Sequence, residues 1–101
     1  MWGNKPITIS KEDKNVISYS VGKLGNSIYT AITYQGTNKI VYQNLITDKG
    51  KFLWGNEGKL LTYQKGSQTN PQFAFVDSSV VVSWTNEFEK RKDVFLSLIH
   101  I

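Results

Sequence analysis

The basic run Lys90-Arg91-Lys92, beside Phe88, concentrates positive charge in one short segment. Ammonium and guanidinium groups bind carboxylates and phosphates, so this run predicts contact with acidic glycans or phosphates. Trp54 is a second candidate, because an indole ring stacks on sugars and anchors protein interfaces. It follows a turn and precedes Gly55, which favours partial exposure. We therefore take Trp54, Lys90, Arg91 and Lys92 as candidate ligand-binding residues, against the alternatives of a core position for Trp54 and a solvated loop for the basic run.

The residues needed for catalysis or metal binding do not occur in a useful pattern. Glu87 and Glu89 would lie about 7 Å apart on one face of an extended chain, but a glycosidase pair is not diagnosed by that spacing. His100 is the single histidine and lies one residue from the chain end, so neither a Ser-His-Asp system nor a histidine-rich metal site is expected. The chain has no cysteine, which excludes disulfides and thiolate zinc sites. We expect no catalytic residues, no metal and no cofactor in this chain.

The charge of the chain is mild and comes almost wholly from lysine. The formal net charge is +4, and Arg91 is the single arginine. Because specific readers of nucleic acids rely on bidentate arginine contacts, we expect no specific nucleic-acid partner. No apolar run approaches the 18 residues that indicate a membrane span, so membrane insertion is not expected either.

The composition is that of an all-β protein. Val, Ile, Thr, Tyr, Phe and Trp make up 38 of the 101 residues, and these types favour a pleated, half-buried surface. Short apolar runs alternate with turn residues about every ten residues, which is typical of antiparallel sandwiches and propellers. The runs predict strands over residues 7–10, 16–21, 27–35, 39–46, 60–64, 72–76, 79–85 and 94–99.

An internal repeat organises these strands. Trp2-Gly3-Asn4 recurs as Trp54-Gly55-Asn56, Ile32-Thr33-Tyr34 matches Val82-Ser83-Trp84, and the segment 41–46 matches 94–99. A period near 50 residues with only β signals indicates about four strands per repeat, the scale of a propeller blade. We therefore predict a single unit, 1–101, made of two repeats of about 1–50 and 51–101. Each repeat is expected to form a blade-like antiparallel four-stranded sheet, giving a partial β-propeller; the alternative is a small β-sandwich.

The motifs Asp48-Lys49-Gly50, Trp54-Gly55-Asn56 and Val82-Ser83-Trp84 resemble repeats of secreted bacterial β-propellers. The resemblance is to the sialidase-like, Asp-box (BNR-like) type and covers nearly the whole chain as about two repeats. It implies that Asp48 and Gly50 shape a turn. Trp84 is expected in the core because it shares a strand face with Val80 and Val82, and Trp2 is taken as a structural core residue as well. The spacing departs from a full Asp box, so the segment is box-like. The arginine cluster of that enzyme family has no counterpart here.

These observations predict a non-catalytic propeller-type scaffold or binding module whose ligand is a carbohydrate or a protein. One alternative is a fragment of a glycoside-hydrolysing, sialidase-like enzyme with its catalytic residues on absent blades. Another is a stand-alone carbohydrate-binding β-sandwich. Because two repeats cannot close a propeller ring, we expect a fragment of a longer protein, or self-association that closes the sheet edges. The resemblance implies a secreted or cell-surface protein.

Overall fold

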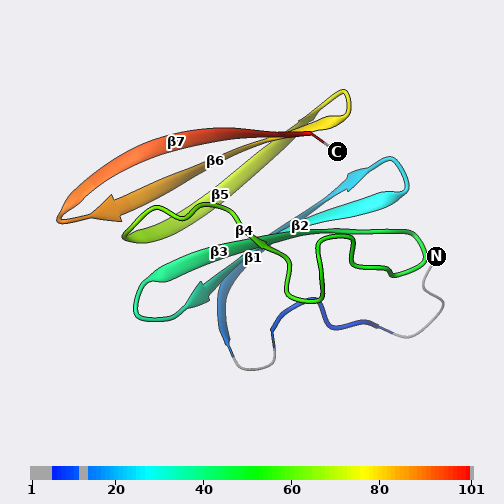
Figure 1. The fold of residues 1–101 in the computed structure, drawn as a ribbon, viewed down its shortest axis with the longest axis horizontal. Coiled ribbons are helices and arrows are strands. Elements are labelled where there is room, and N and C mark those ends of the chain that lie inside the picture. Colours follow the sequence, from blue (N-terminus) through cyan, green and yellow to red (C-terminus); the bar gives the residue numbers. More distant parts are fainter. Residues whose placement is uncertain (1–5, 12–13, 101) are drawn as a thin grey trace.

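The computed structural model describes residues 6–11 and 14–100, which form seven β-strands and no helix. They make two antiparallel sheets that lie beside each other (Figure 1). The first sheet has the order β1 (Asn15–Leu24), β2 (Ser27–Gln35), β3 (Lys39–Ile46) and β4 (Lys59–Leu60), and the second has the order β5 (Ser67–Val76), β6 (Ser79–Phe88) and β7 (Arg91–His100). The all-β prediction is confirmed. Within the described ranges, no helix is long and apolar enough to cross a membrane.

The second sheet has three strands, so the prediction of two four-stranded sheets is wrong. The segment expected to supply its first strand, 60–64, forms only the short β4, which pairs with β3 of the first sheet. Leu61 N still donates to Val41 O at 2.9 Å, after which the chain crosses to the second sheet and leaves its strand partner. The predicted strand 7–10 is also unpaired: Ile9 and Ser10 lie over β1 and β2, around a small apolar hollow, instead of along a strand edge.

The connection between β6 and β7 is much shorter than the interval of eight residues that the predicted strands 79–85 and 94–99 leave between them. Phe88 pairs with Arg91, so only Glu89 and Lys90 form the turn, both at positive φ (53° and 67°). Positive φ at both central residues is the type I′ geometry that suits the twist of a β-hairpin. The charged residues that suggested a loop are tolerated because the ends of β6 and β7 are exposed.

The hydrophobic core lies between the two sheets. Tyr29 and Leu45 of the first sheet pack in one cluster with Val80, Val82 and Trp84 of the second. The Tyr29 ring meets the Phe73 ring edge to face, with 4.8 Å between centroids. Opposite Tyr29, Gly22 keeps β1 close to the second sheet, because a Cβ there would lie 2.5 Å from Phe73 Cε2. The two sheets are therefore held together by aromatic rings that pack closely against the backbone of Gly22, which has no side chain.

The two sheets stack in the same orientation. Val82 and Trp84 of β6 face the first sheet. The equivalent residues of the repeat, Ile32 and Tyr34, lie on the face of β2 that points away from the second sheet, because Ala31 points into the shared core. The two sheets therefore stack head to tail: the face of the second sheet that meets the first is equivalent to the face of the first sheet that points away from the second.

The pairing of the hairpins corrects one detail of the repeat. Ile32 pairs with Tyr42, whereas its equivalent Val82 pairs with Ser97 and not with Phe95. Strand pairing therefore makes Tyr42 equivalent to Ser97, whereas the sequence match made it equivalent to Phe95, a difference of two residues. A shift of two keeps each side chain on the predicted face of its strand.

Candidate functional site

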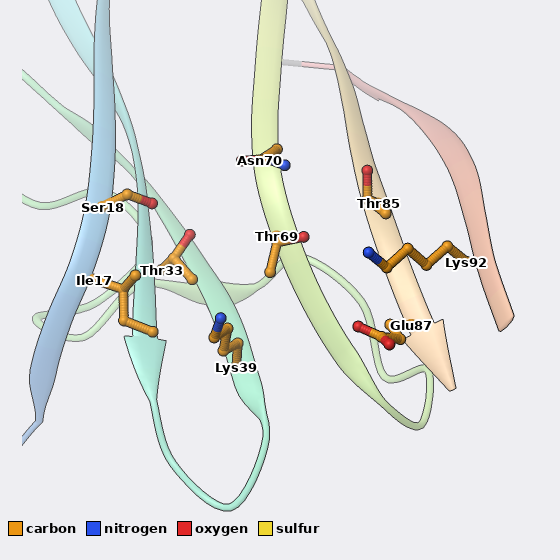
Figure 2. Close-up of a pocket in the computed structure, with 9 residues that line it drawn as sticks. All are labelled: Ile17, Ser18, Thr33, Lys39, Thr69, Asn70, Thr85, Glu87 and Lys92. Atoms are coloured by element: carbon orange, nitrogen blue, oxygen red, sulfur yellow. The ribbon is translucent and has the colours of Figure 1, made fainter. Parts of the chain in front are cut away.

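A polar cleft of about 360 Å³ opens where the first sheet meets the β5 edge of the second sheet, toward the end where the β2–β3 and β6–β7 hairpins turn (Figure 2). Its β6 and β7 residues lie on the face of the second sheet that carries Val94, because Thr85 pairs with Val94 and Glu87 pairs with Lys92. Four of its lining side chains are hydroxyls and three are ionisable. Ligand pockets in proteins are mostly apolar, so a lining of this kind favours a ligand that is itself rich in polar groups. The hydroxyls belong to Ser18, Thr33, Thr69 and Thr85, the ionisable groups to Lys39, Glu87 and Lys92, and the lining is completed by Ile17 and Asn70.

Two β-bulges flank the cleft. The pairing of β1 with β2 shifts between Val16 and Ser18, and the pairing of β5 with β6 shifts between Thr69 and Gln72. Asn70, within the second bulge, has a φ of 54° in the left-handed region, which asparagine tolerates better than most residues. Bulges re-aim side chains and are frequent beside binding sites. Here each bulge contributes lining residues to the cleft, Ile17 and Ser18 from β1 and Thr69 and Asn70 from β5.

Thr33 supplies the most unusual group of the cleft. The residue is only 1% exposed, and its Oγ1 is the single buried side-chain oxygen or nitrogen without a hydrogen-bond partner in the described part of the chain. Figure 2 shows its side chain directed into the space between the sheets. Leaving a buried hydroxyl unpaired costs about 1–3 kcal/mol. A ligand hydroxyl in the cleft would pair with this group and remove that cost.

The charged groups of the cleft come from both sheets. Lys39 is positioned by its backbone N–H, which donates to Ser67 Oγ at 3.0 Å and ties the two sheets together at this end. Glu87 and Lys92 are direct partners across β6 and β7. A hydroxyl both donates and accepts, an ammonium donates and a carboxylate accepts. The cleft can therefore satisfy a ligand whose groups do both, such as a sugar.

The structure divides the predicted basic run. Lys92 lines the cleft, whereas Lys90 occupies the hairpin turn. Arg91 Nε lies 3.0 Å from Asp93 Oδ2 in an exposed pair, beside a separate hollow that Phe95 also lines. An exposed pair of this kind contributes little to stability. The run is thus a strand end and a turn, and only one of its members reaches the cleft.

Trp54 lies toward the other end of the sheets. Its ring is half-buried against the core, 6.3 Å from the Tyr29 centroid, and Lys59 Nζ lies 4.8 Å above it. Asn44 fixes this segment, because its Oδ1 accepts from Trp54 N at 3.1 Å and its Nδ2 donates to Gly55 O at 2.7 Å. Trp54 and Lys92 are therefore not brought together in one site.

The box-like segment forms a tight turn that begins at Thr47. Gly50, at a φ of 81°, donates its N–H to Thr47 O at 2.9 Å. The hydroxyl of Thr47 accepts from Lys49 N and Lys51 N, while Asp48 is exposed.

The structure describes one of the two tryptophans that were expected in the core. Trp84 is buried, stacks on Phe95 at 6.1 Å and donates from Nε1 to Gln64 Oε1 at 3.3 Å. Trp2 lies outside the described residues.

One pair resembles part of a nucleophilic site. Ser79 Oγ and His100 Nδ1 are 2.8 Å apart, on paired residues of β6 and β7. A catalytic histidine is oriented by a third group, and among residues 6–11 and 14–100 no carboxylate contact to His100 is found. The same residues contain no cluster of His, Cys, Asp or Glu that could hold a metal ion. The Ser79–His100 pair is explained by strand pairing at the sheet end.

The sequence interpretation missed most of the cleft. Thr33, Thr69 and Thr85 look like ordinary strand residues, since threonine is common in sheets. Their convergence depends on how the two sheets align.

Comparison with protein-family models, with curated proteins and with solved structures finds no match to this chain.

Proposed function

We propose that this chain is a non-catalytic, propeller-type binding module that holds a carbohydrate in the cleft between its two sheets. The observation that carries the proposal is the buried, unpartnered hydroxyl of Thr33 in a cleft lined by other hydroxyls. A sugar ring presents several groups that both donate and accept, which matches this lining.

The head-to-tail stacking supports the propeller-type arrangement over the sandwich alternative. In a sandwich the inner faces of two sheets enclose one core, and the outer faces are polar. In this chain the equivalent faces of the two repeats point the same way, as in repeated blades. The resemblance to Asp-box propellers, with its secreted or cell-surface setting, agrees with this interpretation and remains part of the proposal.

The carboxylates support a binding role over glycoside hydrolysis. Most glycosidases place two carboxyl groups on either side of the bond that breaks. Glu87 is the one carboxylate among the described residues that line the cleft. Because Glu87 has no second carboxylate opposite it in the cleft, the site favours binding of a sugar over hydrolysis of a glycosidic bond.

The experiment that tests this proposal is isothermal titration of the chain with glucose, galactose, glucuronate and galacturonate, comparing the wild type with Thr33→Val. Valine keeps the shape of threonine and removes the hydroxyl. We expect at least one sugar to bind and Thr33→Val to weaken it about tenfold, the effect of losing about 1.4 kcal/mol. The same variant should be at least as stable as the wild type to heat, because a buried unpaired group is gone.

Thr30→Val is the matched control, because Thr30 is equally buried but lies on the other face of β2. It should leave sugar binding unchanged. If no sugar binds the wild type, or if Thr33→Val binds as tightly as the wild type, the cleft is not the carbohydrate site.

A further inference from the structure

The outer face of the second sheet is uncovered, and beyond the cleft residues Thr85, Glu87 and Lys92 at one end it is apolar. Val94 and Leu96 of β7 are 76% and 69% exposed, and Leu98, Val76 and Ala74 are exposed beside them. The alternate residues of β7, such as Phe95, pack into the core. A strand that is apolar on both sides is typical of a sheet covered on both faces. The uncovered face therefore predicts a partner, since contiguous apolar patches mark interaction sites.

The internal repeat identifies what this face is built to contact. Val41 pairs with Thr33, and Leu96 pairs with Ser83, the equivalent of Thr33 in the repeat. Val41 is 1% exposed because the second sheet covers it. Leu96 is thus the counterpart of a residue that is buried when the next sheet stacks on it.

The complementary surface is found on the outer face of the first sheet. Tyr19 pairs with Ile32 as Phe73 pairs with Val82, which makes Tyr19 the counterpart of Phe73. Phe73 packs against the neighbouring sheet, whereas Tyr19 is 68% exposed. Val21, the counterpart of Phe75 by the same pairing, is also exposed.

The connecting segments match as well. In the internal interface, Gln64 precedes β5 and its Oε1 accepts from Trp84 Nε1 at 3.3 Å. On the outer face of the first sheet, Lys11 precedes β1 and its N–H donates to the hydroxyl of Tyr34, the counterpart of Trp84, at 3.0 Å. The segment over the first sheet is therefore equivalent to one that the internal interface already contains, and it does not block stacking.

We propose that the outer face of β5–β7 binds the outer face of β1–β3 of a second copy of this chain, repeating the internal interface. This inference rests on the propeller-type stacking of the proposed function. A second copy is the partner because each chain carries both halves of the contact. Such a contact is heterologous, so repetition closes a ring or extends a filament. Two to four chains would supply the four to eight sheets of a propeller ring.

Light scattering after size exclusion, with the full chain and two variants, tests this proposal. Leu96→Lys places a charge on the outer face of the second sheet, and Tyr19→Lys does so on that of the first. Both residues are largely exposed, so each variant should keep the folded circular dichroism spectrum. We expect the wild type to exceed the mass of one chain and each variant alone to fall to the mass of one chain at low concentration. An equimolar mixture should form a heterodimer, because each variant retains the half of the contact that the other has lost.

The mixture separates a heterologous contact from a symmetric one. A dimer made from two copies of the β5–β7 face would persist in Tyr19→Lys, and mixing would not restore Leu96→Lys; that result overturns the proposal. Leu53→Lys, at an exposed apolar residue in the loop after β3, is the control and should assemble like the wild type. A wild type that stays monomeric at all concentrations also overturns it. If that monomer still binds sugar in a Thr33-dependent manner, only the self-association fails, whereas an assembled chain that binds no sugar contradicts only the ligand.

Discussion

At the scale of single residues, Tyr29 links packing to ionisation. Its ring lies at the centre of the contact between the sheets, fully buried, and its hydroxyl donates to Gln43 Oε1 at 2.6 Å. Burial raises the pKa of Tyr29 far above the usual value of about 10. Above pH 10 the unfolded chain loses this proton while the folded chain keeps it. The unfolded state then binds fewer protons, so the free energy of unfolding must fall as the pH rises.

Tyr29→Phe tests this linkage. At neutral pH the variant should lose about 1–3 kcal/mol, because Gln43 is left without its buried partner. Above pH 10 the wild type should lose up to about 1.4 kcal/mol per pH unit more than the variant, since phenylalanine does not titrate. Urea unfolding at neutral pH and at two alkaline values measures both effects. Parallel pH profiles for the two proteins would show that Tyr29 does not carry this dependence; Tyr63→Phe, at an exposed tyrosine, is the control.

At the scale of elements, alternation of apolar residues predicted the strands better than the turns. The bounds of β2 and β3 agree with the predicted ranges, because both strands are apolar and their turn contains Gly36. The start of β5 was missed because Gln68 is polar, although it is buried and donates to Asn86 Oδ1 at 3.0 Å. The β6–β7 turn was missed because Glu89 and Lys90 lack the Asn-Gly signal of a type I′ turn.

That turn offers a direct prediction. Glu89 and Lys90 both hold a left-handed backbone conformation that costs a residue other than glycine about 1 kcal/mol. Lys90→Gly should therefore stabilise the chain by about 0.5–1 kcal/mol, measured by urea unfolding. Lys90→Ala keeps the strained backbone and should give no such gain. Because Lys90 does not line the cleft, both variants should bind sugar like the wild type. Weaker binding by either variant would show that the β6–β7 turn is part of the ligand site.

At the scale of the whole molecule, the repeat in the sequence predicted which strands correspond, but not how the sheets divide the chain. The crossing segment that contains Gln64 left the second sheet with three strands. The cleft was beyond prediction for a related reason: Thr33, Thr69 and Lys92 come from different strands and meet only because the two sheets stack in one alignment. Sequence spacing fixes the face of a side chain, whereas the packing of sheets fixes its neighbours across the gap.

The most direct test of the account is to map sugar contacts on the chain by amide chemical shifts, titrating the sugar that binds most tightly. We predict that the largest shifts fall on Thr33, Thr69, Asn70 and Thr85, on both sides of the cleft. Shifts centred on Trp54, or on Lys90 and Arg91 at the hairpin, would place the ligand elsewhere and contradict the central claim that the stacked sheets form the binding site.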